Sequence, residues 1–323
     1  MISRTIRRGA VVLFATVPNA VLGAQTARAD SLLNAGALQR AESLYYAAVQ
    51  VRPRDPMARW ALGRYLVSRG APRVGATLFE EALQFGGDAS VVGADLAPVY
   101  LSLGEYHKLS ALRSSPLSNG ERERARWLVA HSTKLSAPDS ATTLPYRKSA
   151  EPGALGQVVV RINGRSLDAT ITSRERGIVV SDTSALGKRL RTFRIPADAR
   201  GASSTALPGV IDSIAFGRLT LADYPVSVRA LGDNQQVLIG IDVIARFAPT
   251  FDPRGERLTL RTSGTIAKNV AGADELPTLL TRNDLRVLQA GGWASIDQPQ
   301  IARLLTTRRW TFDARRGQLT IER

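Results

Sequence analysis

The chain has 323 residues, 44% of them hydrophobic, and 43 Lys and Arg against 28 Asp and Glu give a formal net charge of +15. This length accommodates two domains with sizeable cores. There is no cysteine and there are two histidines, His107 and His131, which excludes disulfides and cysteine nucleophiles and argues against a histidine metal cluster or a Ser-His-Asp triad. We therefore expect no cofactor and no metal. The basic residues are spread along the chain without interleaved aromatics, so no nucleic-acid partner is expected.

The N-terminal segment 1–24 has the pattern of a secretory signal peptide. Arg4, Arg7 and Arg8 precede the apolar run AVVLFATV, and small residues follow up to Ala24. The run is too short to span a bilayer. We predict a cleaved signal peptide over 1–24, an exported protein in the periplasm or outside the cell, and no integral membrane segment after cleavage. An uncleaved amphipathic anchor is the alternative.

Residues 30–132 are predicted to form a helical repeat. The phrases NAGALQRAESLYYAAV, SRGAPRVGATLFEEAL and SLGEYHKLSAL place Gly36, Gly70 and Gly104 at equal intervals. The interval resembles the period of the tetratricopeptide repeat, about 34 residues, whose helix pairs bury their apolar faces by stacking. Part of that repeat's characteristic face is also present: Trp60, Leu62, Gly63 and Tyr65. The array either binds a peptide or protein on its concave surface or acts as a scaffold for the next domain.

A linker and a β-rich region are predicted next. Residues 133–154 are rich in Pro, Ser, Thr and Ala, which is typical of a linker. The apolar period then changes to two, as in strands. Asn163-Gly164 suits a two-residue hairpin turn between GQVVVRI and RSLDATI.

The order of these strands resembles the retropepsin-like aspartic protease fold, in the bacterial form that follows tetratricopeptide repeats. NGRSLDATI is similar to its first hairpin, IVVSDTSALGKRL to the strand and helix ahead of the flap, DSIAFGRLTLADYPVSV to the next strand pair, VLIGIDVIARF to the apolar-apolar-Gly segment with its helix, and TFDPRGERLTLR to the last hairpin. The resemblance implies an α+β multidomain protein: a helical array, then a closed β-barrel over 155–262. It also implies a flap-like cover near RGASSTALPGV, residues 200–210.

The chemistry of that family needs an Asp-Thr/Ser-Gly loop after the second strand. Two such loops bring two carboxylates together, which share one proton and activate a water. In this chain the loop position holds Thr172, Ser173 and Arg174. Threonine cannot ionise, and arginine replaces the glycine. The resemblance therefore implies a degenerate loop and an inactive, protease-like protein that binds peptides or proteins through the helical array, the former substrate groove, or both. A structural role in an envelope assembly is a further possibility.

Two other residues belong to this interpretation. Asp182, in SDTSALGKRL, offers a rival register in which an active aspartic endopeptidase would form across a homodimer. The alternative for Asp182 is the N-cap of the following short helix. Gly240 matches the glycine of the apolar-apolar-Gly segment and is expected to let strands cross closely behind the loop.

The C-terminal residues 263–323 repeat part of the barrel. PTFDPRGERLTL is similar to WTFDARRGQLTI, and IGIDVIARF to ASIDQPQIARLL. A partial second β lobe is predicted here, with an independent β extension as the alternative. No Asp-Thr/Ser-Gly sequence occurs in this segment. An acid pair within one chain is therefore not expected.

Overall fold

The computed structural model describes residues 19–112, 117–149, 151, 153–193, 206–232, 235–262, 272–281 and 284–323, and the side chains from residue 25 onward. Residues 1–18 of the predicted signal peptide and residues 200–205 of the predicted flap lie outside this part of the chain. Within it, no helix is long and apolar enough to cross a membrane.

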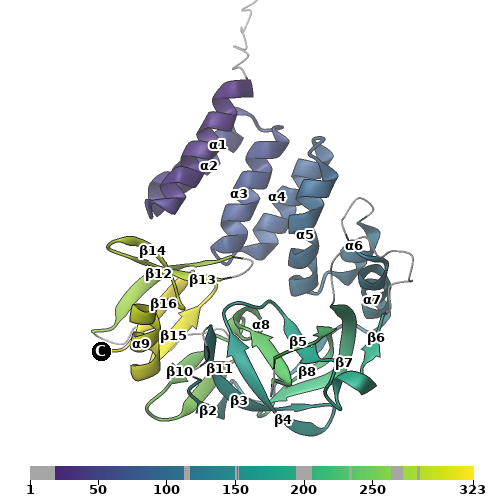
Figure 1. Ribbon diagram of the computed structural model, residues 1–323. Coiled ribbons are helices and arrows are strands. Elements are labelled where there is room, and N and C mark those ends of the chain that lie inside the picture. Colours follow the sequence, from purple (N-terminus) through teal and green to yellow (C-terminus); the bar gives the residue numbers. More distant parts are fainter. Residues whose placement is uncertain are drawn as a thin grey trace, which may run out of the picture.

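The N-terminal part is all-helical, and its helices form antiparallel pairs (Figure 1). The pairs are α1 (Asn19–Asn34) with α2 (Leu38–Val51), α3 (Pro56–Ser68) with α4 (Pro72–Gln84), and α5 (Ala89–Leu103) with α6 (Tyr106–Ala111), followed by α7 (Asn119–Ala130). The turns within the pairs contain Gly36, Gly70 and Gly104, whose φ angles of 79°, 86° and 75° are left-handed. Glycine suits this conformation best. The glycine period of the sequence is therefore the period of the helix pairs.

The middle of the chain is a closed six-stranded β-barrel. Its strands are hydrogen-bonded in the order β3-β4-β9-β5-β8-β7, and a β3–β7 pairing closes the barrel. The bounds are β3 (Ala154–Ile162), β4 (Arg165–Thr172), β5 (Ile178–Ser181), β6 (Arg191–Thr192), β7 (Leu207–Phe216), β8 (Leu219–Arg229) and β9 (Val237–Gly240), with a short 3-10 helix at Gly187–Arg189 and α8 at Ile241–Ala245. The predicted fold class, a helical region followed by a closed β-barrel with further strands, is confirmed.

The segment predicted as a linker contains two strands instead. β1 (Lys134–Ser136) pairs with β8, and β2 (Ala141–Arg147) pairs with both β3 and the later strand β11 (Arg257–Arg261). Alternate side chains of β2 are buried, as expected for a strand with one face on a core. The composition of a linker was misleading because distant strands supply the hydrogen bonds that order this segment.

The C-terminal strands extend the sheet away from the barrel. They follow the hairpin of β10 (Thr250–Asp252) and β11 (Arg257–Arg261). The strands are β12 (Asp274–Leu280), β13 (Leu285–Gln289), β14 (Gly292–Ser295), β15 (Trp310–Asp313) and β16 (Gln318–Ile321), and the helix α9 (Pro299–Thr307) lies between β14 and β15. We call residues 274–321 the C-terminal unit. A sheet in the order β12-β16-β15-β10-β11-β2 joins it to the barrel.

The centre of this joining sheet pairs residues that are equivalent in the two repeated sequences. Thr250 lies opposite Thr311 across the β10–β15 pairing, and their hydroxyl oxygens are 2.8 Å apart. Phe251 stacks on Trp310 with ring centroids 4.0 Å apart. One hydrophobic core runs through both units. The two hairpins are thus related by an approximate two-fold axis, as in a symmetric interface.

The helical array contacts both β units (Figure 1). Arg69 donates to the carbonyl oxygens of Thr278 and Gly317 in the C-terminal unit. On the barrel side, buried Arg124 of α7 donates to the Val226 carbonyl at 2.9 Å. These contacts fix the array across both units.

Candidate functional site

The candidate site is the loop that follows β4. Thr172, the last residue of β4, lies opposite Gly240 in a parallel pairing of β4 with β9. The chain then passes behind Gly240 into β5, which pairs with β9 from its other side. A Cβ on Gly240 would lie 2.5 Å from the Glu175 carbonyl oxygen and 3.0 Å from the Arg176 Cα. Only glycine fits this crossing without moving the backbone.

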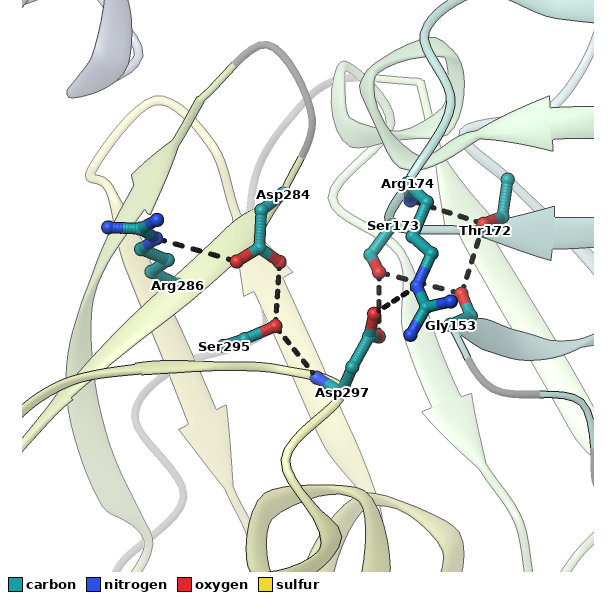
Figure 2. A network of polar contacts seen from close by, with 8 residues as sticks. All are labelled: Gly153, Thr172, Ser173, Arg174, Asp284, Arg286, Ser295 and Asp297. Atoms are coloured by element: carbon teal, nitrogen blue, oxygen red, sulfur yellow. Dashed lines mark hydrogen bonds and ion pairs between the residues drawn. The ribbon is translucent and has the colours of Figure 1, made fainter.

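The side chains of the loop are engaged in local and inter-unit contacts (Figure 2). The Thr172 hydroxyl donates to the Gly153 carbonyl at 3.0 Å and accepts from the Arg174 backbone N–H at 3.1 Å. Ser173 is fully buried, and its hydroxyl donates to Asp297 Oδ1 at 2.8 Å. Arg174 Nε donates to Asp297 Oδ2 at 2.7 Å. Both carboxylate oxygens of Asp297 are thus held by the loop after β4.

Asp297 belongs to a second set of contacts inside the C-terminal unit (Figure 2). Its backbone N–H donates to the Ser295 hydroxyl at 3.2 Å, and that hydroxyl donates to Asp284 Oδ1 at 2.9 Å. Arg286 Nε lies 3.4 Å from Asp284 Oδ2. Sequence reasoning did not assign a role to Asp297 or Asp284. The signal was available for Asp297, because IGIDVIARF aligned with ASIDQPQIARLL places it at the position of Asp242.

Beneath the loop, a second cation lies between acidic residues of the two units. Arg176 is largely buried, donates to the Asp284 carbonyl at 3.3 Å, and interacts electrostatically with Asp242 and Asp284. Burial raises the pKa of Asp242, and the nearby Arg176 and the Gly177 amide offset this in part. The Gly177 N–H lies 3.1 Å from both Asp242 carboxylate oxygens. Arg174 and Arg176 therefore place positive charge at the loop after β4 and beside the carboxylates of Asp297 and Asp242.

Asp182 lies at the far end of β5 from this loop. Four residues along an extended strand separate it from Ile178, a distance of about 13 Å. Its side chain is exposed, and its backbone N–H donates to the Arg229 carbonyl at 3.1 Å. The predicted N-cap role is wrong: the 3-10 helix has no side-chain cap at its start, and the Ser184 hydroxyl accepts from the Gly187 N–H at 2.9 Å. Asp182 follows a strand that runs antiparallel to β9, whereas the loop at 172–177 follows the parallel one.

A pocket of about 410 Å³ lies beside the turn at Asp182 and not at the loop after β4. Its lining mixes neutral polar and apolar residues with one cation: Arg165, Leu167, Ser181, Thr183, Ser184, Ala185, Leu186, Leu231, Gly232, Gln235 and Gln236. The part of the chain that the structure describes contains no group of three His, Asp or Glu that could hold a metal ion. The pocket and the loop are therefore separate features.

A solved structure of a retropepsin-like aspartic protease from Rickettsia conorii is similar to this chain at 17% identity and a TM-score of 0.27, over 40% of this chain and 93% of that one. No family model matches the sequence, and no curated protein matches it. The description of the barrel as retropepsin-like rests on the strand order of the chain itself: hairpin β3–β4, loop, β5, strand pair β7–β8, then β9 with its glycine and α8.

Proposed function

We propose that this is an exported, non-catalytic protein of the aspartic protease fold that binds peptide or protein segments. The observation that carries the proposal is the state of the loop at 172–174. It holds no carboxyl group, its serine is buried, and its arginine pairs with the acidic residue that faces it from the C-terminal unit. Peptide hydrolysis in this family requires two carboxylates that share a proton. The loop instead forms a contact between two β units.

The position of the C-terminal unit argues against the alternative proposal, an active homodimer. Its Asp297 occupies the space next to Ser173 and Arg174. A second copy of the chain would have to displace this unit before its own loop could reach that position. Asp182 is held about 13 Å away along β5. These observations favour binding without cleavage.

The helical array offers a face for a partner. Arg64 on α3 is half-exposed and lies over the Trp60 ring, 4.8 Å from its centroid. The Trp60 N–H donates to Asp95 on α5 at 2.9 Å. An ordered aromatic ring with a cation above it provides contact area at little entropic cost, which is the character of peptide-binding hot spots.

The test combines hydrolysis and binding on the same protein. A mixture of unstructured peptides is incubated with the chain from pH 3 to pH 7, and products are followed by mass spectrometry with and without a pepstatin-type inhibitor. We expect no inhibitor-sensitive cleavage. Fluorescence anisotropy of individual peptides should show saturable binding that Arg64→Glu weakens at least about tenfold and Arg218→Glu, on the barrel surface, leaves unchanged.

Inhibitor-sensitive cleavage that Asp182→Asn abolishes would establish the active homodimer and end the proposal. Absence of both cleavage and saturable binding would point to a purely structural role. The location is tested separately, by finding the chain in the periplasmic or extracellular fraction after expression with residues 1–24 intact.

A further inference from the structure

The pocket beside the turn at Asp182 lies at one end of the β-barrel. It is bounded by the first half of β4, the turn that follows β5, and the segment between β8 and β9. Arg165 and Leu167 are on the same face of β4 as Ala169 and Ile171, which are buried in the core. The volume of about 410 Å³ is in the range of small-ligand sites, about 300–1,000 Å³, which occur in the mouths of β-barrels. The function proposed above does not use this pocket.

One wall of the pocket is apolar. Leu186 is buried and belongs to the core cluster of the β units, and Leu167 is partly buried and packs against that cluster. Leu231, which follows β8, is also partly buried and completes the wall. An aliphatic group that covers these leucines would remove further apolar surface from water.

The lining of the pocket has one positive charge and no carboxylate. Its cation is Arg165, which is exposed and forms no ion pair among the residues that the structure describes. Asp182 adjoins the lining in sequence but is not part of it. Glu151 accepts a hydrogen bond from the side chain of Gln235 at 2.7 Å. Since a guanidinium binds a carboxylate through paired, charge-assisted hydrogen bonds, the pocket favours a ligand with one anionic group.

Several polar groups of the lining can still form hydrogen bonds. The Ser181 and Thr183 hydroxyls share one bond of 2.8 Å, which uses one of their two protons. The backbone N–H groups of Thr183 and Ala185 have no acceptor within the described part of the chain. The exposed Gln236 side chain has no partner there either, and its amide can both donate and accept. The pocket thus offers donors to an anion and a match for a peptide group.

We infer that this pocket binds the C-terminal end of a peptide whose last side chain is aliphatic. The terminal carboxylate pairs with Arg165 and the N–H groups of the turn, and the last side chain covers Leu167 and Leu186. Arginine and turn N–H groups are suited to this task, because terminal carboxylates are commonly captured by backbone N–H groups. The inference rests on the proposed function, peptide binding, and adds a second site separate from the face of the helical array.

The test measures fluorescence anisotropy of two labelled tetrapeptides with the full chain. One ends in a leucine with a free carboxylate, and the other is the same peptide with a C-terminal amide. Amidation removes the charge that faces Arg165, so we expect it to weaken binding at least about tenfold. Arg165→Gln should weaken binding of the free acid to the same extent and leave binding of the amide unchanged. The matched control Arg161→Gln removes an exposed cation of β3 outside the pocket and should change neither affinity by more than about twofold.

Equal affinity for the acid and the amide, or equal effects of Arg165→Gln and Arg161→Gln, overturns the inference. Octanoate tests the requirement for a peptide, because it has a carboxylate and an apolar chain but no peptide group. It should not displace the free-acid peptide at equal concentration, and equal displacement would contradict the assignment to peptides. Arg64→Glu separates the two proposals. Binding that Arg64→Glu weakens, but amidation and Arg165→Gln do not, would support the proposed function and end this inference.

Discussion

Three residues change what the β4 loop can do. Thr172 caps the loop through its hydroxyl, Arg174 pairs with Asp297, and Ser173 turns a buried hydroxyl toward the same carboxylate. Gly153 makes room for this arrangement, because a Cβ there would lie 2.4 Å from Arg174 Nε. The loop thereby becomes a contact between the barrel and the C-terminal unit. The same contact gives a prediction about stability.

Asp297→Ala should destabilise the protein more than Arg174→Ala. The loss of Asp297 leaves the buried Ser173 hydroxyl without its carboxylate acceptor, which costs about 1–3 kcal/mol. The Arg174 side chain is half-exposed, and exposed ion pairs contribute about 0–1 kcal/mol. Urea unfolding of the single and double variants measures both values and their coupling.

The control for this comparison is Arg218→Ala, which removes an ion pair of the same 2.7 Å length between more exposed partners, Arg218 and Asp139. It should change the free energy of unfolding by less than about 1 kcal/mol. Equal effects of Asp297→Ala and Arg218→Ala would show that the inter-unit contact has no special role.

Asp242 predicts a pH dependence of stability. Burial raises its folded-state pKa above the ordinary value of 3.8, so the folded state holds a proton that the unfolded state releases. As the pH rises from about 3.8 through the folded-state pKa, the unfolding free energy contributed by Asp242 must fall, at up to about 1.4 kcal/mol per pH unit. Asp242→Asn cannot release that proton. The difference in unfolding free energy between the native chain and Asp242→Asn should therefore decrease with pH over this window.

Urea titrations of both proteins from pH 3 to pH 7 provide the measurement. A difference that increases with pH would mean that the Gly177 amide and Arg176 outweigh burial and lower the pKa. Because the comparison is a difference between two chains, titration of all other groups largely cancels.

Single residues of the site were only partly predictable from sequence. The position of Thr172–Arg174 follows from counting strand residues after Asn163-Gly164, and that count depends only on local order. The pairing of Ser173 with Asp297 joins residues 124 positions apart. Such a pair is set by how the two β units pack, which no local pattern contains. The N-cap prediction for Asp182 failed for the opposite reason. A local capping pattern was present in the sequence, but the hydroxyl of Ser184, and not Asp182, accepts the Gly187 N–H.

At the scale of elements, glycine is required in the turns of the helical array for two different reasons, backbone conformation and close packing. Gly70 and Gly86 have the same φ of 86°. A Cβ on Gly70 would lie 1.6 Å from the Ala314 carbonyl oxygen, whereas nothing lies within 4 Å of one on Gly86. The first turn is therefore constrained by conformation and by packing, the second by conformation alone.

Gly70→Ala should consequently be more destabilising than Gly86→Ala. Both substitutions place alanine in the left-handed region, at a cost of about 1–2 kcal/mol. Gly70→Ala must also displace the β15–β16 turn, which adds about 1–3 kcal/mol. Thermal and urea unfolding compare the two. Equal destabilisation would show that the α3–α4 turn does not press on the C-terminal unit in solution.

Elements with a strong local period were the predictable ones. The second helices of the pairs begin at Leu38, Pro72 and Tyr106, each two residues after its turn glycine, so the glycine spacing contains their period. The hairpin at Asn163-Gly164 forms as its turn residues require. Strands β1 and β2 were missed because most of their pairing is with β8 and β11, which lie far away in the sequence.

At the scale of the molecule, the boundaries between hydrophobic cores do not coincide with the boundaries between the repeated segments of the sequence. The barrel and the C-terminal unit share one hydrophobic core, although they are separate in sequence and differ in size. The central helices of the array have a core of their own around Phe79 and Leu96. The array and the β units meet through a small apolar cluster of Tyr106, Leu128 and Val210, and through hydrogen bonds and close backbone contacts such as those of Arg69 and Gly70. We therefore expect the two β units to unfold together, and the central helices of the array to unfold as a separate unit.

Trp310→Ala and Phe79→Ala test this division by hydrogen exchange. Each removes a large, fully buried ring, at a cost of about 3–5 kcal/mol. Trp310 stacks on Phe251 at the joint of the two β units, so Trp310→Ala should accelerate exchange in β3–β4 of the barrel and in β13–β14 of the C-terminal unit together. Phe79→Ala should accelerate exchange in α3–α5 and leave those strands protected, because elements that share a core open as one unit. Faster exchange confined to β13–β14 in Trp310→Ala would mean that the C-terminal unit unfolds independently. In that case the contact between Asp297 and the loop after β4 would open with it, and the loop would be exposed in a measurable fraction of molecules.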